Sequence, residues 1–208
     1  MSSPKPEKRN LDILADEVLY DGFFRLRRVT LSHQLFAGGM SPPIQREVLD
    51  MRRAVAVLLY DPERDALVMI EQFRIGAINP PAGGWVLELV AGIVEPGESD
   101  TELAHRESME EAGCTISDLA LINEYMVAPA ATTERIALYV ARVDARTAHG
   151  IHGLREEGED IRVRVLSAEQ AIAETRPGGR INTTTPIIAM QWFAANRDAL
   201  RTRWLASA

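Results

Sequence analysis

The sequence predicts a mixed α/β domain, an α+β arrangement in which helices pack against a mixed sheet. Short apolar runs with the two-residue period of half-buried strands occur both before and after a central helix, and a long helix closes the chain. The 208 residues, of which 46% are hydrophobic and 25% charged, are enough to bury a sizeable core. Disorder is excluded for most of the chain, because this apolar fraction is that of an ordinary globular protein.

The N-terminal part predicts a tail, a small sheet and then the main domain. Residues 1–9 are polar and contain two prolines, which predicts a flexible tail. Residues 10–51 alternate short apolar and polar stretches, as expected for a small separate β-segment. Residues 52–208 form the main domain. Its first two apolar runs, at residues 54–60 and 66–73, flank turn-forming residues and predict a hairpin.

A central helix is predicted to begin at Ser99 or Asp100 and to end at Gly113. Ser99 and Glu102 have the spacing of a capping box, in which each side chain binds the backbone amide of the other residue. Gly113 ends the helix, because glycine readily adopts the left-handed backbone conformation found there.

The second half of the chain predicts further strands and two more helices. Ser167 with Gln170 begins a short helix, since the pair repeats the capping-box spacing. Thr185 caps a last helix, with Pro186 in its first turn, that runs to about Arg203. Strands are expected at residues 119–126, 135–143 and 161–166.

Charge and composition narrow the possible functions. With 23 basic against 30 acidic side chains, the chain has a formal charge of −7 and lacks the basic surface that a nucleic-acid backbone requires. No stretch approaches the roughly 20 apolar residues that span a bilayer, and no secretory leader opens the chain. A single cysteine, Cys114, provides neither an internal disulfide nor a cysteine-based zinc cluster. We therefore expect a cytoplasmic protein that binds neither nucleic acid nor membranes.

The central helix carries three carboxylates on one side. At about 100° per residue, Glu107, Glu110 and Glu111 fall within one side, and Arg106 lies at its edge. Like charges this close repel, so the arrangement needs cations, and hard oxygen ligands favour Mg²⁺ or Mn²⁺ over Zn²⁺. A solvated acidic surface is the simpler interpretation of a glutamate pair. It leaves unexplained the capped start, the arginine and the glycine stop at fixed spacing.

The acidic helix belongs to a longer pattern that resembles a known signature. Residues 92–113 read Gly-x5-Glu-x7-Arg-Glu-x-x-Glu-Glu-x-Gly, which is similar to the Nudix box of hydrolases that act on nucleoside diphosphates linked to another moiety. Ser108 and Cys114 stand where the family prefers bulky apolar residues, and both differences concern packing. The resemblance implies a Nudix-type α/β/α sandwich with a small N-terminal antiparallel β-subdomain.

Outside the box, the chain resembles the ADP-ribose pyrophosphatase branch of this family. Pro129 follows the last box glycine by 16 residues, as in that branch. Residues 71–74 before the box, residues 88–92 leading into it and residues 150–154 ahead of an acidic loop are further similarities. Residues 130–133 depart from the branch, because they replace the glycine-rich turn that usually follows the proline.

The resemblance implies a role for each acidic residue. It assigns Mg²⁺, with Mn²⁺ as a possible substitute, to one carbonyl and three carboxylates: Ala91, Glu107, Glu111 and Glu159. Glu110 would add a water-mediated ligand, and Arg106 would orient the carboxylates through charge-assisted hydrogen bonds. Glu157 corresponds to the general base, and the pattern leaves open whether Glu157 or Glu159 removes the proton.

The resemblance also implies residues that bind substrate. Arg46 and Arg74 would pair with phosphate oxygens. At most one of Phe23 and Phe24 would stack on adenine, because a phenylalanine on an apolar strand more often packs in the core. Glu134 would accept hydrogen bonds from the terminal ribose. The full set of expected substrate contacts is Phe23, Phe24, Arg46, Glu47, Arg74, Ile93, Pro129 and Glu134.

The expected reaction is Mg²⁺-dependent hydrolysis of ADP-ribose to AMP and ribose 5-phosphate, by a water that metal and a glutamate base activate. The alternatives are hydrolysis of another nucleotide sugar such as GDP-mannose, hydrolysis of NADH, and a non-catalytic sensor that binds ADP-ribose. The family also implies a homodimer in which residues 11–51 reach across to the partner and contribute to its site.

Overall fold

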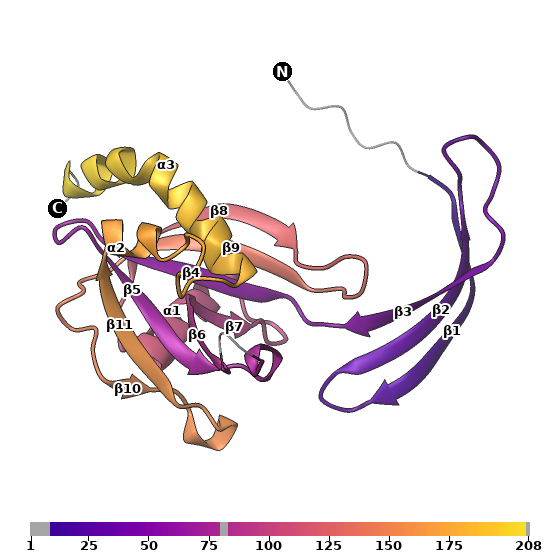
Figure 1. Cartoon of the computed structure of the whole chain (residues 1–208), viewed down its shortest axis with the longest axis horizontal. Coiled ribbons are helices and arrows are strands. Elements are labelled where there is room, and N and C mark those ends of the chain that lie inside the picture. Colours follow the sequence, from indigo (N-terminus) through magenta and orange to yellow (C-terminus); the bar gives the residue numbers. More distant parts are fainter. Residues whose placement is uncertain (1–8, 80–82, 207–208) are drawn as a thin grey trace. The chain divides into compact units, whose positions relative to one another are not determined.

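The structure, a computed structural model, describes residues 9–79 and 83–206, and the chain falls into two compact units (Figure 1). The first unit contains the chain up to Arg52 together with Met126–Glu134. The second contains Arg53–Tyr125 and the chain from Arg135 onward. The flexible tail predicted for residues 1–9 lies outside the described residues except for its last residue.

The first unit is a three-stranded antiparallel sheet in the order β1-β2-β3. Its strands are β1 (Leu11–Asp21), β2 (Arg25–His33) and β3 (Ile44–Asp50). A loop from far along the chain joins them, because the Leu49 amide donates to the Ala131 carbonyl at 2.8 Å. The Met51 amide likewise donates to Thr133 Oγ1 at 2.8 Å. The sequence predicts the strands but not this loop contribution.

Much of the apolar surface of this small sheet is exposed. On β1, Leu11, Ile13 and Tyr20 are each more than half exposed. Polar contacts join neighbouring strands instead, as where Arg27 Nε donates to Asp50 Oδ2 at 2.7 Å. Burial therefore contributes little to the stability of this sheet by itself, since three strands need a covered apolar face to be stable.

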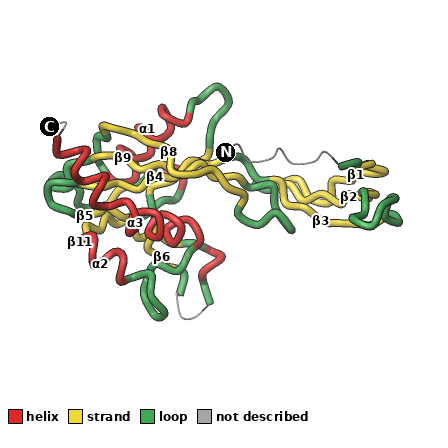
Figure 2. The backbone as a smooth tube through the Cα atoms, turned by 90° about the horizontal axis from the view of Figure 1, so that it is seen from above, coloured by secondary structure: helices red, strands yellow, loops and turns green. Residues whose placement is uncertain are grey.

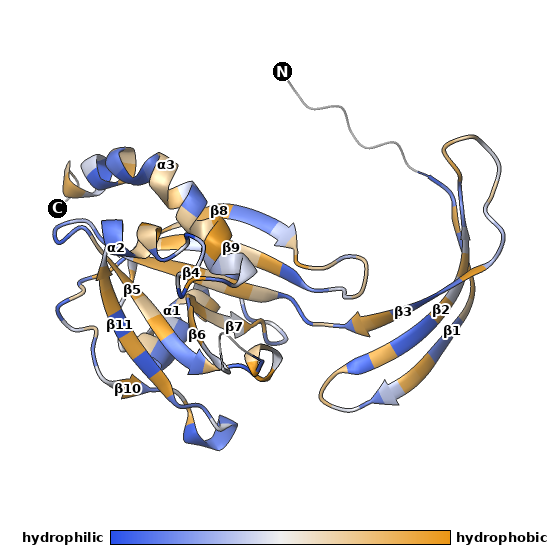
Figure 3. Cartoon of the chain, in the orientation of Figure 1, coloured by the Kyte–Doolittle hydropathy of each residue, from blue (hydrophilic) through white to orange (hydrophobic). Residues whose placement is uncertain are grey.

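The second unit contains a mixed eight-stranded sheet. Six strands follow the order β10-β11-β5-β4-β9-β8, while β6 pairs with β5 and β7 pairs with β4. The strands are β4 (Ala54–Asp61), β5 (Ala66–Phe73), β6 (Trp85–Glu88), β7 (Val90–Ile93), β8 (Ser117–Met126), β9 (Arg135–Arg142), β10 (Ile151–His152) and β11 (Ile161–Ser167). Strands β4 and β9 are parallel, and hydrophobic residues run through the centre of the sheet (Figure 3).

Helices cover both faces of this sheet, which makes the unit an α/β/α sandwich (Figure 2). On one face Leu103 packs with Val55, and on the other Phe193 packs with Leu58. The helices are α1 (Asp100–Ala112), α2 (Ala168–Ala173) and α3 (Thr184–Ala206), with single 3-10 turns at Ile75–Ala77 and Arg155–Glu157. The predicted mixed α/β fold with a small antiparallel sheet is confirmed.

An ion pair fixes the long last helix to the first hairpin of this unit. Arg197 of α3 binds Asp65 with two guanidinium nitrogens, and the Tyr60 hydroxyl donates to Asp65 Oδ1 at 2.8 Å. Asp65 has a φ of 53°, a left-handed conformation that aspartate and asparagine tolerate better than most residues. The hairpin turn and the helix are therefore held by one carboxylate.

The local capping signals are confirmed at α1 and corrected at α3. Ser99 and Glu102 form the predicted capping box, and Gly113 has a φ of 63° at the end of α1. The last helix begins at Thr184 rather than after a Thr185 cap, and it extends beyond Arg203 to Ala206. The Thr185 hydroxyl is used elsewhere, because it accepts a hydrogen bond from Tyr125 at 2.8 Å. Over residues 9–79 and 83–206, no helix is long and apolar enough to cross a membrane.

Candidate metal and active site

Helix α1 brings Glu107 and Glu111 against strand β7. Glu111 is only 2% exposed, and its Oε2 accepts a hydrogen bond from the Ala91 amide at 2.9 Å. Glu107 lies over Gly92, where an added Cβ would come within 1.9 Å of Glu107 Oε1. A side chain at position 92 would therefore displace the Glu107 carboxylate from this position.

Arg106 holds the other carboxylates of the pattern. Its Nε binds Glu98 Oε1 at 3.0 Å, and its Nη1 binds Glu110 Oε2 at 2.9 Å. The same Nη1 is 3.0 Å from Glu107 Oε1. Glu98 in turn accepts the Glu95 amide at 3.2 Å, which ties the loop before α1 to the arginine. One guanidinium thus orients three carboxylates, as charge-assisted hydrogen bonds allow.

The two carboxylates next to β7 both have raised pKa values, because burial disfavours their charged forms. Burial raises the pKa of Glu107 to about 7, and the charges of Glu110 and Glu159 act in the same direction. Burial raises the pKa of Glu111 to about 8, although the Ala91 amide partly offsets this rise. A dication would favour the ionised forms of both groups, and carboxylate oxygens suit Mg²⁺. The donor set therefore fits the expected metal chemically.

In the acidic loop at residues 156–160, the expected residues Glu157 and Glu159 differ in their contacts. The Glu159 Oε2 accepts the Leu154 amide at 2.9 Å, so this carboxylate is turned back on its own loop. Glu157 lies in the exposed 3-10 turn. The Gly153 amide donates to the Glu110 carbonyl at 3.1 Å and connects the loop to α1. In the described parts of the chain, no three acidic, histidine or cysteine side chains converge as a closed metal-binding group.

Only two of the expected substrate residues belong to the unit that carries α1. Arg74 follows β5, and its Nε donates to Glu88 Oε2 at 2.8 Å. The charge of Arg74 also lowers the pKa of Glu111, so the guanidinium acts on the same site. Ile93 ends β7 and is partly buried.

The remaining expected substrate residues belong to the first unit. Phe23 is 81% exposed and Phe24 40%, with their rings in an edge-to-face contact at 4.8 Å, so neither is a core residue. Burial raises the pKa of Glu134. The first-unit set is Phe23, Phe24, Arg46, Glu47, Pro129 and Glu134.

Two acidic residues near α1 have partners that the sequence does not predict. Glu88 is the partner of Arg74, and its position before the box gives no sign of this pairing. Asp100, the first residue of α1, binds Arg53 and accepts a hydrogen bond from the Tyr139 hydroxyl. Both partners lie far from Asp100 in the sequence, and no local pattern connects them.

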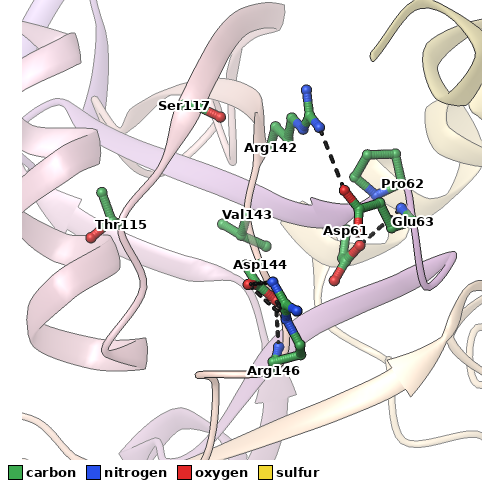
Figure 4. Close-up of a pocket in the computed structure, with 9 residues that line it drawn as sticks. All are labelled: Asp61, Pro62, Glu63, Thr115, Ser117, Arg142, Val143, Asp144 and Arg146. Carbon is green, nitrogen blue, oxygen red and sulfur yellow. Dashed lines mark hydrogen bonds and ion pairs between the residues drawn. The ribbon is translucent and has the colours of Figure 1, made fainter. Parts of the chain in front are cut away.

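A separate cavity of about 300 Å³ lies where β4 and β9 end, at Asp61 and Arg142 (Figure 4). Its charges are mostly paired within the protein: Arg146 binds Asp144, and Arg142 Nη1 donates to the Trp204 carbonyl at 2.9 Å. The carboxylate of Asp61 accepts three backbone amides. We assign no catalytic role to this cavity.

The chain belongs to the Nudix family, because residues 50–184 match the model of the NUDIX domain. It is 42% identical over 197 residues to the ADP-ribose pyrophosphatase of Escherichia coli, which covers 95% of this chain and 94% of that protein. It is 41% identical over 203 residues to the ADP-ribose pyrophosphatase of Haemophilus influenzae, covering 96% and 93%. The predicted resemblance to this hydrolase branch is therefore confirmed.

More distant similarities agree with the family assignment. The chain is 30% identical over 172 residues to the GDP-mannose pyrophosphatase of Citrobacter koseri, which covers 82% of this chain and 88% of that protein. The crystal structure of an ADP compounds hydrolase superimposes with a TM-score of 0.68 at 21% identity, covering 97% of this chain and 98% of the other. The latter similarity supports the fold.

The raised pKa values predict how the stability of the metal-free protein depends on pH. Because the folded-state pKa of Glu111 is about 8, the folded state binds more protons than the unfolded state between about pH 4.5 and 8. The free energy of unfolding in EDTA should therefore fall as the pH rises from 6 to 8. Urea denaturation at pH 6, 7 and 8 measures this, and Glu111→Gln should show a smaller fall. An equal fall in both proteins would contradict the assigned burial.

Proposed function

We propose that this chain hydrolyses the diphosphate of ADP-ribose to AMP and ribose 5-phosphate with Mg²⁺, or with Mn²⁺ as a substitute. The observation that carries the proposal is the buried carboxylate of Glu111 beside the partly buried carboxylate of Glu107, against Ala91 and Gly92. It lies within the segment that matches the NUDIX domain, in a chain 42% identical to an ADP-ribose pyrophosphatase.

The proposed metal ligands are the Ala91 carbonyl and the carboxylates of Glu107, Glu111 and Glu159, with Glu110 acting through water. When bound, Mg²⁺ would neutralise charge on the diphosphate and lower the pKa of a water. Arg106 would direct Glu107 and Glu110, because its Nη1 lies 3.0 Å from Glu107 Oε1 and donates to Glu110 Oε2 at 2.9 Å. Glu159 accepts the Leu154 amide with Oε2, and its other oxygen would serve as the ligand.

The chain's own residues would then carry the proton and the phosphate charge. Glu157 would accept the proton of the attacking water as general base, with Glu159 as the alternative base. The water oxygen forms a bond to one phosphorus, and the bond from that phosphorus to the bridging oxygen breaks. Arg74 would stabilise the negative charge on the departing phosphate, a role that requires it to share or leave Glu88.

The proposed substrate contacts extend beyond the metal site. Phe23 or Phe24 would stack on adenine, for which their exposure leaves both available. Arg46 would bind phosphate, and Glu134 would accept hydrogen bonds from the ribose. Glu47, Ile93 and Pro129 complete the proposed set. The cytoplasmic location and the absence of nucleic-acid or membrane binding stay predictions from the sequence.

A second candidate substrate is GDP-mannose, with NADH as a further possibility. Residues 130–133 lack the expected glycine-rich turn, and the Ala131 and Thr132 amides both donate to the Ala128 carbonyl at 2.9 Å. This tight turn alters the backbone next to Pro129, which is an expected substrate contact. A non-catalytic sensor is less well supported, because the chain retains Glu107, Glu110 and Glu111.

Substrate choice is tested by hydrolysis of ADP-ribose, GDP-mannose and NADH at equal concentration with Mg²⁺. We expect release of AMP from ADP-ribose to be fastest, and Glu111→Gln to lower its kcat by at least about 100-fold, because a buried metal ligand is lost. The exposed carboxylate of Asp198 on α3 offers a matched control, Asp198→Asn, that should keep full activity. Faster cleavage of GDP-mannose would show that it is the preferred substrate in place of ADP-ribose. Binding of ADP-ribose without cleavage would favour the non-catalytic sensor.

We also propose that the chain forms a homodimer in which residues 11–51 contribute to the partner's site. The support is the exposed apolar surface of β1, which a second copy could cover. Analytical ultracentrifugation at micromolar concentration should give a single species of twice the chain mass. Replacing Leu11 and Ile13 with serine should shift it toward the monomer, and a wild-type monomer would contradict the proposal.

A further inference from the structure

The loop that leads into α1 is fixed at both ends by a single residue. Arg53 directly precedes β4, and its carbonyl accepts the amide of Val94, the first residue after β7, at 3.0 Å. Its guanidinium binds both carboxylate oxygens of Asp100, the first residue of α1, with Nη2 to Oδ2 at 2.6 Å. Between these two contacts lies the loop that carries Glu98.

Asp100 also receives a donor from a second strand. The Tyr139 hydroxyl of β9 donates to Asp100 Oδ2 at 2.8 Å, and β9 is the parallel neighbour of β4. The bound guanidinium, with help from Tyr139, holds the pKa of Asp100 below its ordinary value, so the carboxylate is ionised at neutral pH. Ser99 already caps the helix. The contacts of Asp100 therefore serve to connect α1 to the sheet.

Leu103 is the one large apolar side chain that α1 buries against the sheet, and the other residues it buries there are small or polar. The helix presents Ala104, Ser108 and Ala112 to the sheet, and all three are completely buried. Small side chains allow a close approach, but they form shallow ridges that resist sliding less than large interlocking side chains do. The ion pair at the first helical residue, in which one guanidinium binds both carboxylate oxygens of Asp100, adds a directional restraint.

We propose that Arg53, Asp100 and Tyr139, the Asp100 cluster, set the position of α1 along the sheet and thereby the placement of its metal-binding glutamates. Asp100 is a positioning residue in this proposal, which rests on the proposed metal-dependent function. It acts in two ways. It anchors α1, on which Glu107 and Glu111 lie about 10–17 Å along the axis. It also limits the movement of Glu98, which holds Arg106.

The chain contains a closely matched control for this cluster. Asp65 is likewise bound by two guanidinium nitrogens of one arginine, Arg197, and by a tyrosine hydroxyl, Tyr60, at 2.8 Å. The exposed fraction of its side chain is 16%, against 20% for Asp100. Asp65 holds the hairpin and α3, which carry none of the proposed metal ligands. Asp65→Asn should therefore lower stability as Asp100→Asn does without affecting metal binding.

The test measures Mg²⁺ binding by calorimetry without substrate, and then the Mg²⁺ dependence of ADP-ribose hydrolysis. Asp100→Asn should raise the Kd for Mg²⁺ by about 10-fold, as loss of a supporting contact around a metal site does. It should lower kcat while the KM for ADP-ribose at saturating Mg²⁺ changes by less than about twofold. Asp65→Asn should bind Mg²⁺ as the wild type does.

A second variant, Tyr139→Phe, tests the same cluster while leaving the Arg53–Asp100 ion pair in place. It removes one hydrogen bond to Asp100 and should raise the Kd for Mg²⁺ by about threefold. If Asp100→Asn does not fold, the Kd for Mg²⁺ of Tyr139→Phe decides the test. An unchanged Kd in the folded variants would overturn the proposal, as would an equal rise in Asp65→Asn. If the wild type binds Mg²⁺ but leaves ADP-ribose uncleaved, the proposed substrate fails while the calorimetry still decides the role of the cluster.

Discussion

The placement of two carboxylates against β7, one buried and one partly buried, is the constraint on which the rest of the site depends. Glu111 is 2% exposed, and the partly buried carboxylate of Glu107 occupies the side-chain space above Gly92. Burial of charge is costly unless the charge is paired. The Ala91 amide and Arg106 supply part of this pairing, and a divalent cation is the ligand whose charge would supply the remainder.

Several contacts around these carboxylates hold the helix that carries them in place. Arg106 links the helix to the loop through Glu98, and Gly153 links the helix to the acidic loop through the Glu110 carbonyl. Asp100 links the start of the helix to two strands. The site of the proposed chemistry thus lies within the second unit, on a helix restrained at its start and along its acidic side.

Local signals predicted more of this structure than long-range ones. Ser99, Glu102 and Gly113 lie within one helix, so their spacing alone determines the capping box and the stop. The acidic pattern was recognisable because its members share one helix and one loop. The pairing of Asp100 with Tyr139 and the docking of Thr133 against Met51 depend on the tertiary fold, which no short window encodes. Thr185 has the chemistry of a cap, but its hydroxyl bonds to Tyr125 in the folded chain.

The proposed metal site is tested most directly by a titration with Mn²⁺, in which electron paramagnetic resonance measures the free ion. If Glu107 and Glu111 together form the metal site, the wild type binds Mn²⁺ stoichiometrically at micromolar protein. Glu107→Gln should then leave most of the ion free at the same concentration, while Asp198→Asn binds as the wild type does. Equal binding by wild type and Glu107→Gln would place the metal elsewhere and contradict the account.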